Sequence, residues 1–424
     1  MKCMILFHRL PKNDAEDILS VLFKILHSNM SVIAPTGNDY EKDYRIWIES
    51  VIHGLKQDAR QIILIYDDAE IIGYFQYYVN SSTFMMEEIQ FKKEYQGTGI
   101  FRLLYSYLFE IIPQETLYVE AYAHKQNSKS QNILKHLGLR IVGENKNGNS
   151  YHFRGDCRET LKKYNIRESA IKEMALRISN ILSDCSPSIY LYGSLPLGDF
   201  RFGWSDIDIL VLTDKQMSEE QAQKLVNLRQ TMLEKEPGNL YYRSFEGGML
   251  TRETFMSRYP DRVVYWGTSG EKITDTYVFD SFSMAELIES STLLYGRDIR
   301  GQLKAPIYSD LYADVKRHYE TIRMYVQKTD RNLYSFGWLL DIARCLYTLR
   351  TGKIIAKTAA ADWALENNLC PVPNALKIAV KVRKAPLLYE ADKQMLDYAE
   401  TLGESIQRFA DVLEKELEER RIWQ

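Results

Sequence analysis

The chain has 424 residues and a formal net charge of -3, with 45% hydrophobic and 26% charged residues. This composition is typical of a soluble globular protein, and the length allows about three domains. The slightly acidic balance argues against a nucleic-acid partner, because polyanion binders usually carry a basic excess. No apolar run is long enough for a membrane span, and the one that opens the chain is too short for a signal peptide. The 5 cysteines show no pairing rhythm, so we expect a cytoplasmic protein with no membrane partner.

The first part of the chain predicts helices followed by a meander of strands, because apolar spacing changes from helical to alternating. Asp14 is expected to cap the first helix. The expected elements are helices over 14–27 and 40–54, strands over 61–66, 71–79 and 83–91, a helix over 95–112, a strand over 117–123, a helix over 127–137 and a strand over 139–143.

A glycine turn, Gln96-Gly97-Thr98-Gly99, leads directly into the helix that continues from Ile100. Such a turn points backbone amides toward an anion, for example a pyrophosphate. The order of strand, glycine turn, helix and strand, followed by Asn127 and Ser130, resembles the GNAT acetyltransferase fold over nearly all of residues 1–153. The resemblance implies that acetyl-CoA is a substrate, that Gln96–Ile100 hold its pyrophosphate and that Asn127 contacts the cofactor arm.

Two positions depart from that family. Phe101 stands where Gly or Ala usually follows the turn, and Leu134 stands where many members place a tyrosine that protonates the leaving thiolate. An acceptor amine must lose a proton before it attacks, and Glu87, Glu88 or Glu120 could take it. A solvated position on a strand is the alternative for each glutamate, so the base and the accepting amine stay open.

The most informative stretch is residues 188–212. An apolar strand ends at Gly193-Ser194, and after a loop a second apolar strand carries Asp206 and Asp208. Strand alternation places both carboxylates on one face. They repel each other unless a cation lies between them, and Mg²⁺ prefers such oxygen ligands while leaving room for substrate phosphates. Gly193 allows a tight turn, and Ser194 offers a hydroxyl and an amide to a phosphate.

This combination resembles the signature of the nucleotidyltransferase superfamily, which has a polymerase-beta-like fold. The resemblance implies that ATP and Mg²⁺ bind at the two aspartates and that a substrate hydroxyl attacks the α-phosphate. A hydroxyl nucleophile needs a base. We expect a strand over 240–250 beside the aspartates, which makes Glu246 the candidate base and Glu253 and Asp261 weaker competitors. Asp199 and Arg201, in the loop before the aspartates, could reach the nucleotide or be solvated, and we expect them to be solvated.

Helical spacing dominates from residue 304 onward and predicts a compact bundle. Residues 339–367 resemble the C-terminal helical domain of the streptomycin/spectinomycin adenylyltransferases. The match includes Arg344, Lys357 and the segments 351–354 and 361–364. It implies that Arg344 and Lys357 reach the ATP phosphates. It also supports Glu246 as the base, since Arg243-Ser244-Phe245-Glu246 matches the family's Arg-x-x-Glu segment.

The acceptor is less certain, because Tyr334 replaces the acidic residue with which these enzymes grip a cationic drug. Asp330 and Asp341 lie nearby and could substitute. Ser269 takes the place of a drug-pocket tryptophan, with Trp266 close but out of register. The aromatic residues expected to line a pocket for a cation are Tyr241, Tyr242, Tyr334, Trp266 and Trp338.

The sequence therefore predicts a mixed α+β and α/β multidomain transferase with an antibiotic-resistance role, divided into a GNAT domain (1–155), a nucleotidyltransferase domain (156–303) and a helical domain (304–424). The expected reactions are transfer of AMP to a hydroxyl of an aminoglycoside-like acceptor and acetylation of an amine. Two alternatives stay open. The adenylyltransferase could act on a protein or a housekeeping metabolite, and the GNAT half could bind CoA or another ligand without turnover.

Overall fold

The computed structural model describes residues 5–10, 15–31, 33–56, 60–257, 262–267 and 270–420. The chain forms two compact units. The N-terminal unit runs through Ser169 and includes Glu236–Asn239, and the C-terminal unit comprises Ala170–Lys235 and the chain from Leu240 onward. The expected cap Asp14 lies outside the described residues, and the predicted boundaries near 155 and 303 stay predictions. No described helix is both long enough and apolar enough to cross a membrane.

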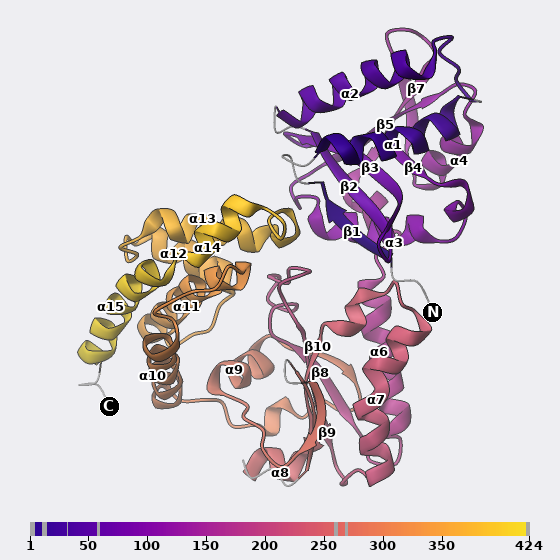
Figure 1. The fold of residues 1–424 in the computed structure, drawn as a ribbon. Helices are drawn as coiled ribbons and strands as arrows, with labels where there is room; N and C mark the ends of the chain where they lie inside the picture. The colour runs from indigo at the N-terminus through magenta and orange to yellow at the C-terminus, as the bar shows by residue number, and fades with distance from the viewer. Residues whose placement is uncertain are drawn as a thin grey trace. The chain divides into compact units, whose positions relative to one another are not determined.

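The N-terminal unit is built on a seven-stranded sheet with the order β1-β2-β3-β4-β5-β7-β6. Helices α1 and α2 pack against β2, β3 and β4 (Figure 1). Its elements are β1 (Ile5–Arg9), α1 (Ala15–Met30), α2 (Tyr40–Lys56), β2 (Arg60–Asp67), β3 (Glu70–Asn80), β4 (Thr83–Phe91), α3 (Ile100–Ile111), β5 (Tyr118–His124), α4 (Ser128–His136), β6 (Arg140–Glu144), β7 (Ser150–Asp156) and α5 (Cys157–Lys162).

The two parallel strands of this sheet separate part of the way along their length. β4 pairs with β5 from Thr83 opposite Tyr118 to Met86 opposite Ala121. Beyond that point β4 continues to Phe91 and β5 to His124 without pairing to each other. The sheet is therefore open between the second halves of these strands, and side chains of both can face one cavity.

The C-terminal unit contains a six-stranded sheet with the order β12-β11-β10-β9-β8-β13. The elements of this part are α6 (Arg167–Ile181), β8 (Ser188–Tyr192), β9 (Ile207–Thr213), α7 (Glu219–Lys235), η2 (Leu240–Arg243), β10 (Phe245–Thr251), α8 (Arg252–Ser257), β11 (Val263–Gly267), β12 (Gly270–Thr274), α9 (Ser281–Glu289), β13 (Thr292–Tyr295) and η3 (Arg300–Gln302). Strands β8 and β9 are apolar and almost wholly buried, as expected for the centre of a sheet.

The prediction of one strand over 240–250 is wrong in its first half. Residues Leu240–Arg243 form a 3-10 turn, and β10 begins at Phe245. The turn buries both Tyr241 and Tyr242, at 3% and 1% exposure. A strand would have placed these two neighbours on opposite faces, so burial of both side chains favours the turn.

Six helices follow and pack around α11 (Figure 1). They are α10 (Tyr308–Tyr325), α11 (Gly337–Thr351), α12 (Lys357–Glu366), α13 (Pro373–Lys384), α14 (Lys393–Glu400) and α15 (Gly403–Arg420). The buried face of α12 consists of small residues, Ala360, Ala361 and Ala364. Small side chains let α12 pack closely on α11, which brings Lys357, at the start of α12, near Arg344 on α11.

Candidate active site

The three carboxylates predicted from the sequence meet at one end of the C-terminal sheet. Asp208 on β9 and Glu246 on β10 are direct partners in the parallel register. Asp206 immediately precedes β9, and its side chain hydrogen-bonds to that of Glu246. Glu246 Oε1 also accepts a hydrogen bond of 2.9 Å from the Tyr265 hydroxyl. These contacts hold Glu246 beside the aspartate pair.

The clustered negative charge helps to raise the pKa of both aspartates. Desolvation and the neighbouring Glu246 carboxylate raise the pKa of Asp206 to about 7. Burial, followed by the charges of Asp206, Glu286 and Glu246, raises the pKa of Asp208 well above its usual range. Like charges in a desolvated site are costly unless a cation neutralises them. Among the described residues no group of three or more His, Cys, Asp or Glu has the geometry of a metal site, so the protein offers a carboxylate pair.

The glycine turn that precedes the two aspartates passes close to the side chain of Asp208. Gly193 has φ +74°, and a Cβ at this position would overlap the Asp208 carboxylate. The backbone therefore passes directly over one aspartate, which only glycine permits. The next residue, Ser194, has a buried hydroxyl that makes no hydrogen bond to any described group. A buried unpaired hydroxyl is costly, and a ligand oxygen would satisfy it.

A cavity of about 380 Å³ opens over these groups. Glu246 is not among its lining residues and lies beside Asp206 at its edge. The described lining residues are Tyr192, Gly193, Ser194, Leu197, Asp199, Trp204, Ser205, Asp206, Asp208, Asp280, Phe282, Ser283, Glu286, Tyr334, Arg344, Ala356, Lys357 and Arg383.

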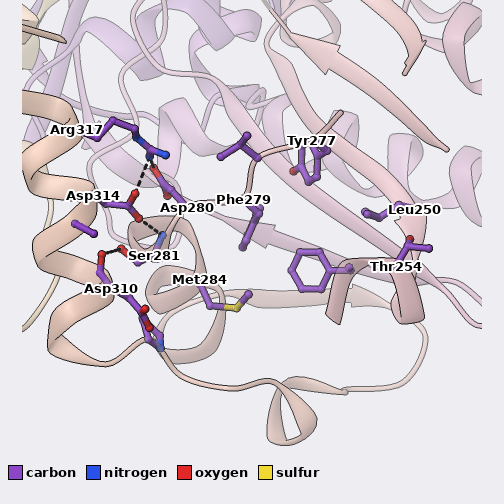
Figure 2. A pocket seen from close by; sticks show the side chains of 14 residues that line it. Leu250, Thr254, Tyr277, Phe279, Asp280, Ser281, Met284, Asp310, Asp314 and Arg317 are labelled. Atoms are coloured by element: carbon purple, nitrogen blue, oxygen red, sulfur yellow. Dashed lines mark hydrogen bonds and ion pairs between the residues drawn. The ribbon is translucent and has the colours of Figure 1, made fainter. Parts of the chain in front are cut away.

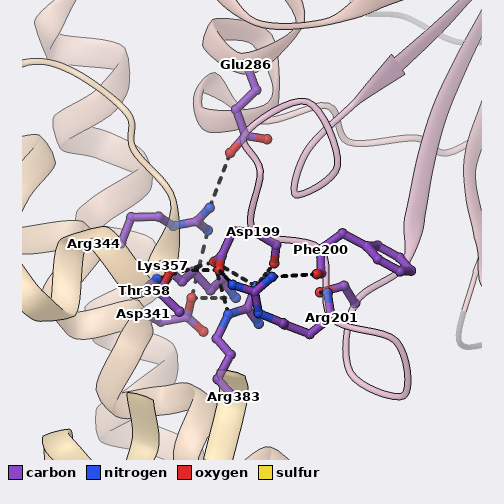
Figure 3. Close-up of polar contacts among 10 residues, drawn as sticks. Asp199, Phe200, Arg201, Glu286, Asp341, Arg344, Lys357, Thr358 and Arg383 are labelled. Atoms are coloured by element: carbon purple, nitrogen blue, oxygen red, sulfur yellow. Dashed lines mark hydrogen bonds and ion pairs between the residues drawn. The ribbon is translucent and has the colours of Figure 1, made fainter. Parts of the chain in front are cut away.

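Both predicted cations reach this cavity from the helices, and each is held by an acid. Lys357 Nζ lies 2.8 Å from Asp341 Oδ1, and Arg344 lies 3.3 Å from Glu286 (Figure 3). Burial alone would lower the pKa of Arg344, but Asp341 and Glu286 raise it. Arg344 Nε is buried without a hydrogen-bond partner among the described residues. The acids thus orient both cations and keep the Arg344 guanidinium charged.

The expectation that Asp199 and Arg201 are solvated is wrong. Asp199 is 2% exposed and accepts hydrogen bonds from Thr358 Oγ1 at 2.7 Å and Arg383 Nε at 3.1 Å (Figure 3). Arg201 lies 3.6 Å from Asp199, with its side chain 19% exposed. Arg383 is itself 4% exposed, and a buried guanidinium needs an anion. The loop before the aspartates is therefore clamped to α12 and α13.

Sequence reasoning missed several residues of the cavity, among them Glu286 and Trp204. Glu286 lies on α9 and gave no motif signal, and Trp204 precedes the aspartates, with its ring centroid 5.3 Å from that of Tyr334. Of the predicted aromatic lining only Tyr334 is present. Tyr241, Tyr242 and Trp266 are core residues, and Trp338 packs on the helical core. Ser269 and Asp261 lie outside the described residues.

A second cavity of about 340 Å³ lies between β10, α9 and α10 (Figure 2). Its acids already have partners in the protein. Asp314 accepts a 2.7 Å hydrogen bond from the Ser281 amide and pairs with Arg317 at 3.0 Å, and Asp310 accepts from the Ile307 amide. Asp280 also lines this cavity, accepts from the Ser283 amide and pairs with Arg317, so each acid of the described lining has a partner within the protein.

In the N-terminal unit, the predicted glycine turn opens α3. Gly97 and Gly99 have φ of +81° and +91°, and nothing lies within 4 Å of a Cβ built at either position. The Thr98 hydroxyl donates to the Tyr95 carbonyl at 2.7 Å, which closes the turn. The space beside the two glycines at the start of α3 is therefore open, and the N-terminus of a helix is where an anion can bind.

A cavity of about 340 Å³ occupies the gap between β4 and β5. Asn127 lines it and also caps α4 by accepting from the Ser130 amide. Leu134 and Phe101, the two departures from the GNAT pattern, line it as well. The described lining residues are Leu26, Met30, Phe75, Met86, Glu87, Glu88, Ile89, Gln90, Phe101, Tyr105, Ala121, Tyr122, Ala123, His124, Asn127, Ser130, Ile133 and Leu134.

Comparison with known families agrees with this geometry. Residues 21–139 match the model of the acetyltransferase (GNAT) family, residues 171–247 that of the nucleotidyltransferase domain, and residues 307–415 that of the aminoglycoside adenylyltransferase C-terminal domain. The chain is therefore an enzyme with a GNAT fold at its N-terminus, a nucleotidyltransferase domain and a helical C-terminal region, which confirms the predicted fold class and families.

Individual relatives cover parts of the chain. Spectinomycin 9-adenylyltransferases of Staphylococcus aureus strains Mu50 and N315 are 25% identical to it over 215 residues, which are 47% of this chain and 80% of theirs. Among solved structures, the PaiA N-acetyltransferase of Thermoplasma acidophilum in complex with coenzyme A aligns with 16% identity and a TM-score of 0.31, covering 36% of this chain and 98% of that one.

Proposed function

We propose that the C-terminal unit is an ATP-dependent adenylyltransferase that transfers AMP to a hydroxyl of an aminoglycoside-like acceptor and releases pyrophosphate. The observation that carries this proposal is the convergence of Asp206, Asp208 and Glu246 beside a cavity that Arg344 and Lys357 also line. A triphosphate needs anchored positive charge, and a hydroxyl nucleophile needs a base.

The residues present fit a magnesium ion. Asp206 and Asp208 would supply the oxygen ligands, and the Asp206 charge helps to raise the pKa of the buried Asp208, a cost that a bound cation would remove. When bound, Mg²⁺ would supply neutralisation of the phosphate charge and orientation of the α-phosphate. The unpaired hydroxyl of Ser194 is suited to a phosphate oxygen.

The remaining steps belong to protein side chains. Arg344 and Lys357 stabilise the charge on the departing pyrophosphate, and because Glu286 and Asp341 already orient them, they need little rearrangement. Glu246 takes the proton of the attacking hydroxyl. The Tyr265 hydroxyl, which donates to Glu246, fixes the direction in which that carboxylate presents its other oxygen.

The lining supports a cationic acceptor. Trp204 and Tyr334 supply aromatic rings to the cavity, while its acids Asp280 and Glu286 are paired with Arg317 and Arg344. Ring faces suit the ammonium groups of an amino sugar. A protein or metabolite acceptor is the alternative, because Tyr334 stands where an acid grips the drug in the adenylyltransferases that the chain resembles.

The test is pyrophosphate release with ATP, Mg²⁺ and a panel that contains streptomycin, spectinomycin and kanamycin. Asp208→Asn is expected to reduce the rate by about 10³-fold or more, because one charged group at the phosphates is worth that much. The matched control is Asp214→Asn, the same change just past the end of β9, where the side chain is 45% exposed. Labelled AMP on cell protein, and on no drug of the panel, would favour the alternative acceptor.

We further propose that the N-terminal unit transfers an acetyl group from acetyl-CoA to an amine. The open glycine turn at the start of α3 and the cavity that Asn127 lines support this assignment. We assign Gln96–Ile100 to the pyrophosphate and Asn127 to the cofactor arm. Since Leu134 offers no proton donor, a module that binds CoA without turnover is the alternative.

Calorimetric titration with coenzyme A tests the anion site directly. Gly99→Val places a branched side chain over the amides at φ +91° and is expected to weaken binding by about tenfold or more. Gly37→Val imposes the same kind of strain at φ +81°, also in open space but outside the turn, and should leave the affinity unchanged. Equal losses in both variants would contradict the assignment of the turn.

A further inference from the structure

The glutamates of the N-terminal unit differ sharply in their partners. Glu87 receives both Arg60 Nε at 2.6 Å and Arg60 Nη2 at 2.8 Å. Glu120 pairs with His152 at 2.9 Å and Arg154 at 3.1 Å. The two carboxylates are therefore neutralised within the protein, which removes them as bases for an incoming amine.

Glu88 has no cationic partner among the described residues. Its carboxylate accepts hydrogen bonds from the Tyr74 hydroxyl at 2.5 Å, Trp47 Nε1 at 3.3 Å and Gln90 Nε2 at 3.4 Å. All three donors are neutral. Burial raises the pKa of Glu88, and these hydrogen bonds oppose the rise. A buried carboxylate without a counterion is costly, and a cationic ligand would remove that cost.

Hydrogen bonds connect Glu88 to the glycine turn. Gln96 donates to Asn29 Oδ1 at 3.3 Å, and Asn29 donates to Gln90 Oε1 at 3.0 Å. Gln90 then donates to Glu88. These hydrogen bonds fix the position of the Glu88 carboxylate relative to the turn that we assign to the cofactor.

Most of the cavity around Glu88 is apolar. Among its described lining residues the only acids are Glu87, which Arg60 neutralises, and Glu88. The rest of the surface includes Phe75, Met86, Ile89, Phe101, Tyr105, Ile133 and Leu134. Part of this lining, at Asn127, is assigned above to the cofactor arm, so the acceptor meets Glu88 and the rest of the wall. That wall offers no second unpaired acid among the described residues, which disfavours polyamines and amino sugars.

We propose that the acetyl-transfer site accepts amines with one primary ammonium group on an apolar body, and that Glu88 binds this group and takes its first proton. The proposal rests on the acetyltransferase function proposed above.

The chemistry balances with acetyl-CoA as the second reactant. Glu88 removes one proton from the ammonium group, and the nitrogen lone pair forms a bond to the thioester carbonyl carbon. The bond from carbon to sulfur then breaks, and its electron pair leaves with the sulfur. Of the two protons that the nitrogen loses in total, one ends on the CoA thiol and the other passes to solvent.

The experiment measures thiol release by the full chain from acetyl-CoA with phenethylamine, spermidine or kanamycin. We expect kcat/KM for phenethylamine to exceed that for both polycations by about tenfold or more, because the cavity penalises each unpaired charge. Glu88→Gln should lower the phenethylamine value by about 100-fold. Glu144→Gln, the same change at a glutamate whose side chain is 46% exposed and lies outside the cavity lining, should stay within about threefold of the parent.

Preference for spermidine or kanamycin would overturn the proposal, as would parental activity in Glu88→Gln. The preference of the unaltered chain tests the cavity even where Glu88→Gln fails to fold. Titration with coenzyme A distinguishes a failure of the acetyltransferase assignment from a failure of the proposed acceptor class. Without coenzyme A binding the acetyltransferase assignment itself fails. If coenzyme A binds but the chain acetylates only polycations, or no amine at all, only the proposed acceptor class is overturned.

Discussion

The buried clamp at Asp199 makes a sharp prediction about the stability of the C-terminal unit. Asp199→Ala removes the acceptor for Thr358 Oγ1, at 2.7 Å, and for Arg383 Nε, at 3.1 Å. The guanidinium of Arg383 then stays 4% exposed without a counterion. Removing one member of a buried ion pair costs about 3–5 kcal/mol, because the other charge remains desolvated.

That loss is large enough to read from thermal unfolding. For a unit of this size each kcal/mol shifts the melting temperature by about 2–4 °C, so we expect a decrease of about 6–20 °C. Calorimetry of the full chain measures it, with Asp214→Ala at the surface as the control. The double variant Asp199→Leu, Arg383→Met should recover most of the loss, because replacing both partners leaves no unpaired charge.

Loss of the clamp also has a kinetic consequence. Thr358 follows Lys357 at the start of α12, so the clamp also fixes the backbone that carries one of the proposed phosphate-binding cations. We expect Asp199→Asn to raise KM for ATP more than it lowers kcat. The reasoning is refuted if Asp199→Ala melts within about 2 °C of the parent, or if the double variant is no more stable than the single one.

Two further predictions concern the aspartate pair. The folded-state pKa of Asp206, about 7, lies above its unfolded value, so the folded state binds the extra proton and metal-free stability should fall as pH rises from about 4 through 7. Melting temperatures across this range should show a shallower decline for Asp206→Asn. Gly193→Ala should displace the Asp208 carboxylate and lower adenylyl transfer by about 100-fold or more. Gly198→Ala, at φ +71° in open space, should cost only about 1–2 kcal/mol of local strain.

Each of these two predictions would be contradicted by a specific result. An identical pH slope in the parent and in Asp206→Asn would assign the slope to other groups. Equal activity of Gly193→Ala and Gly198→Ala would mean that the close approach of the turn to Asp208 has no role in transfer.

Local sequence patterns determined the family and much of the site. The glycine turn before Ile100 and the Gly193-Ser194 turn before Asp206 and Asp208 each lie within a short stretch. In such a stretch φ, strand alternation and helix starts depend on the residues themselves. The apolar strand after Asp206 likewise predicted its own burial. These features could be predicted without knowing which distant residues pack against them.

Tertiary structure decided which charged residues are free to act. Asp199 looked solvated until the fold brought Arg383, 184 positions away, to its carboxylate. Glu87, Glu88 and Glu120 looked equivalent until the fold placed Arg60 beside Glu87 and Arg154 beside Glu120. A sequence shows the type and spacing of a charge, but its ionisation and availability depend on neighbours that only the packed chain supplies.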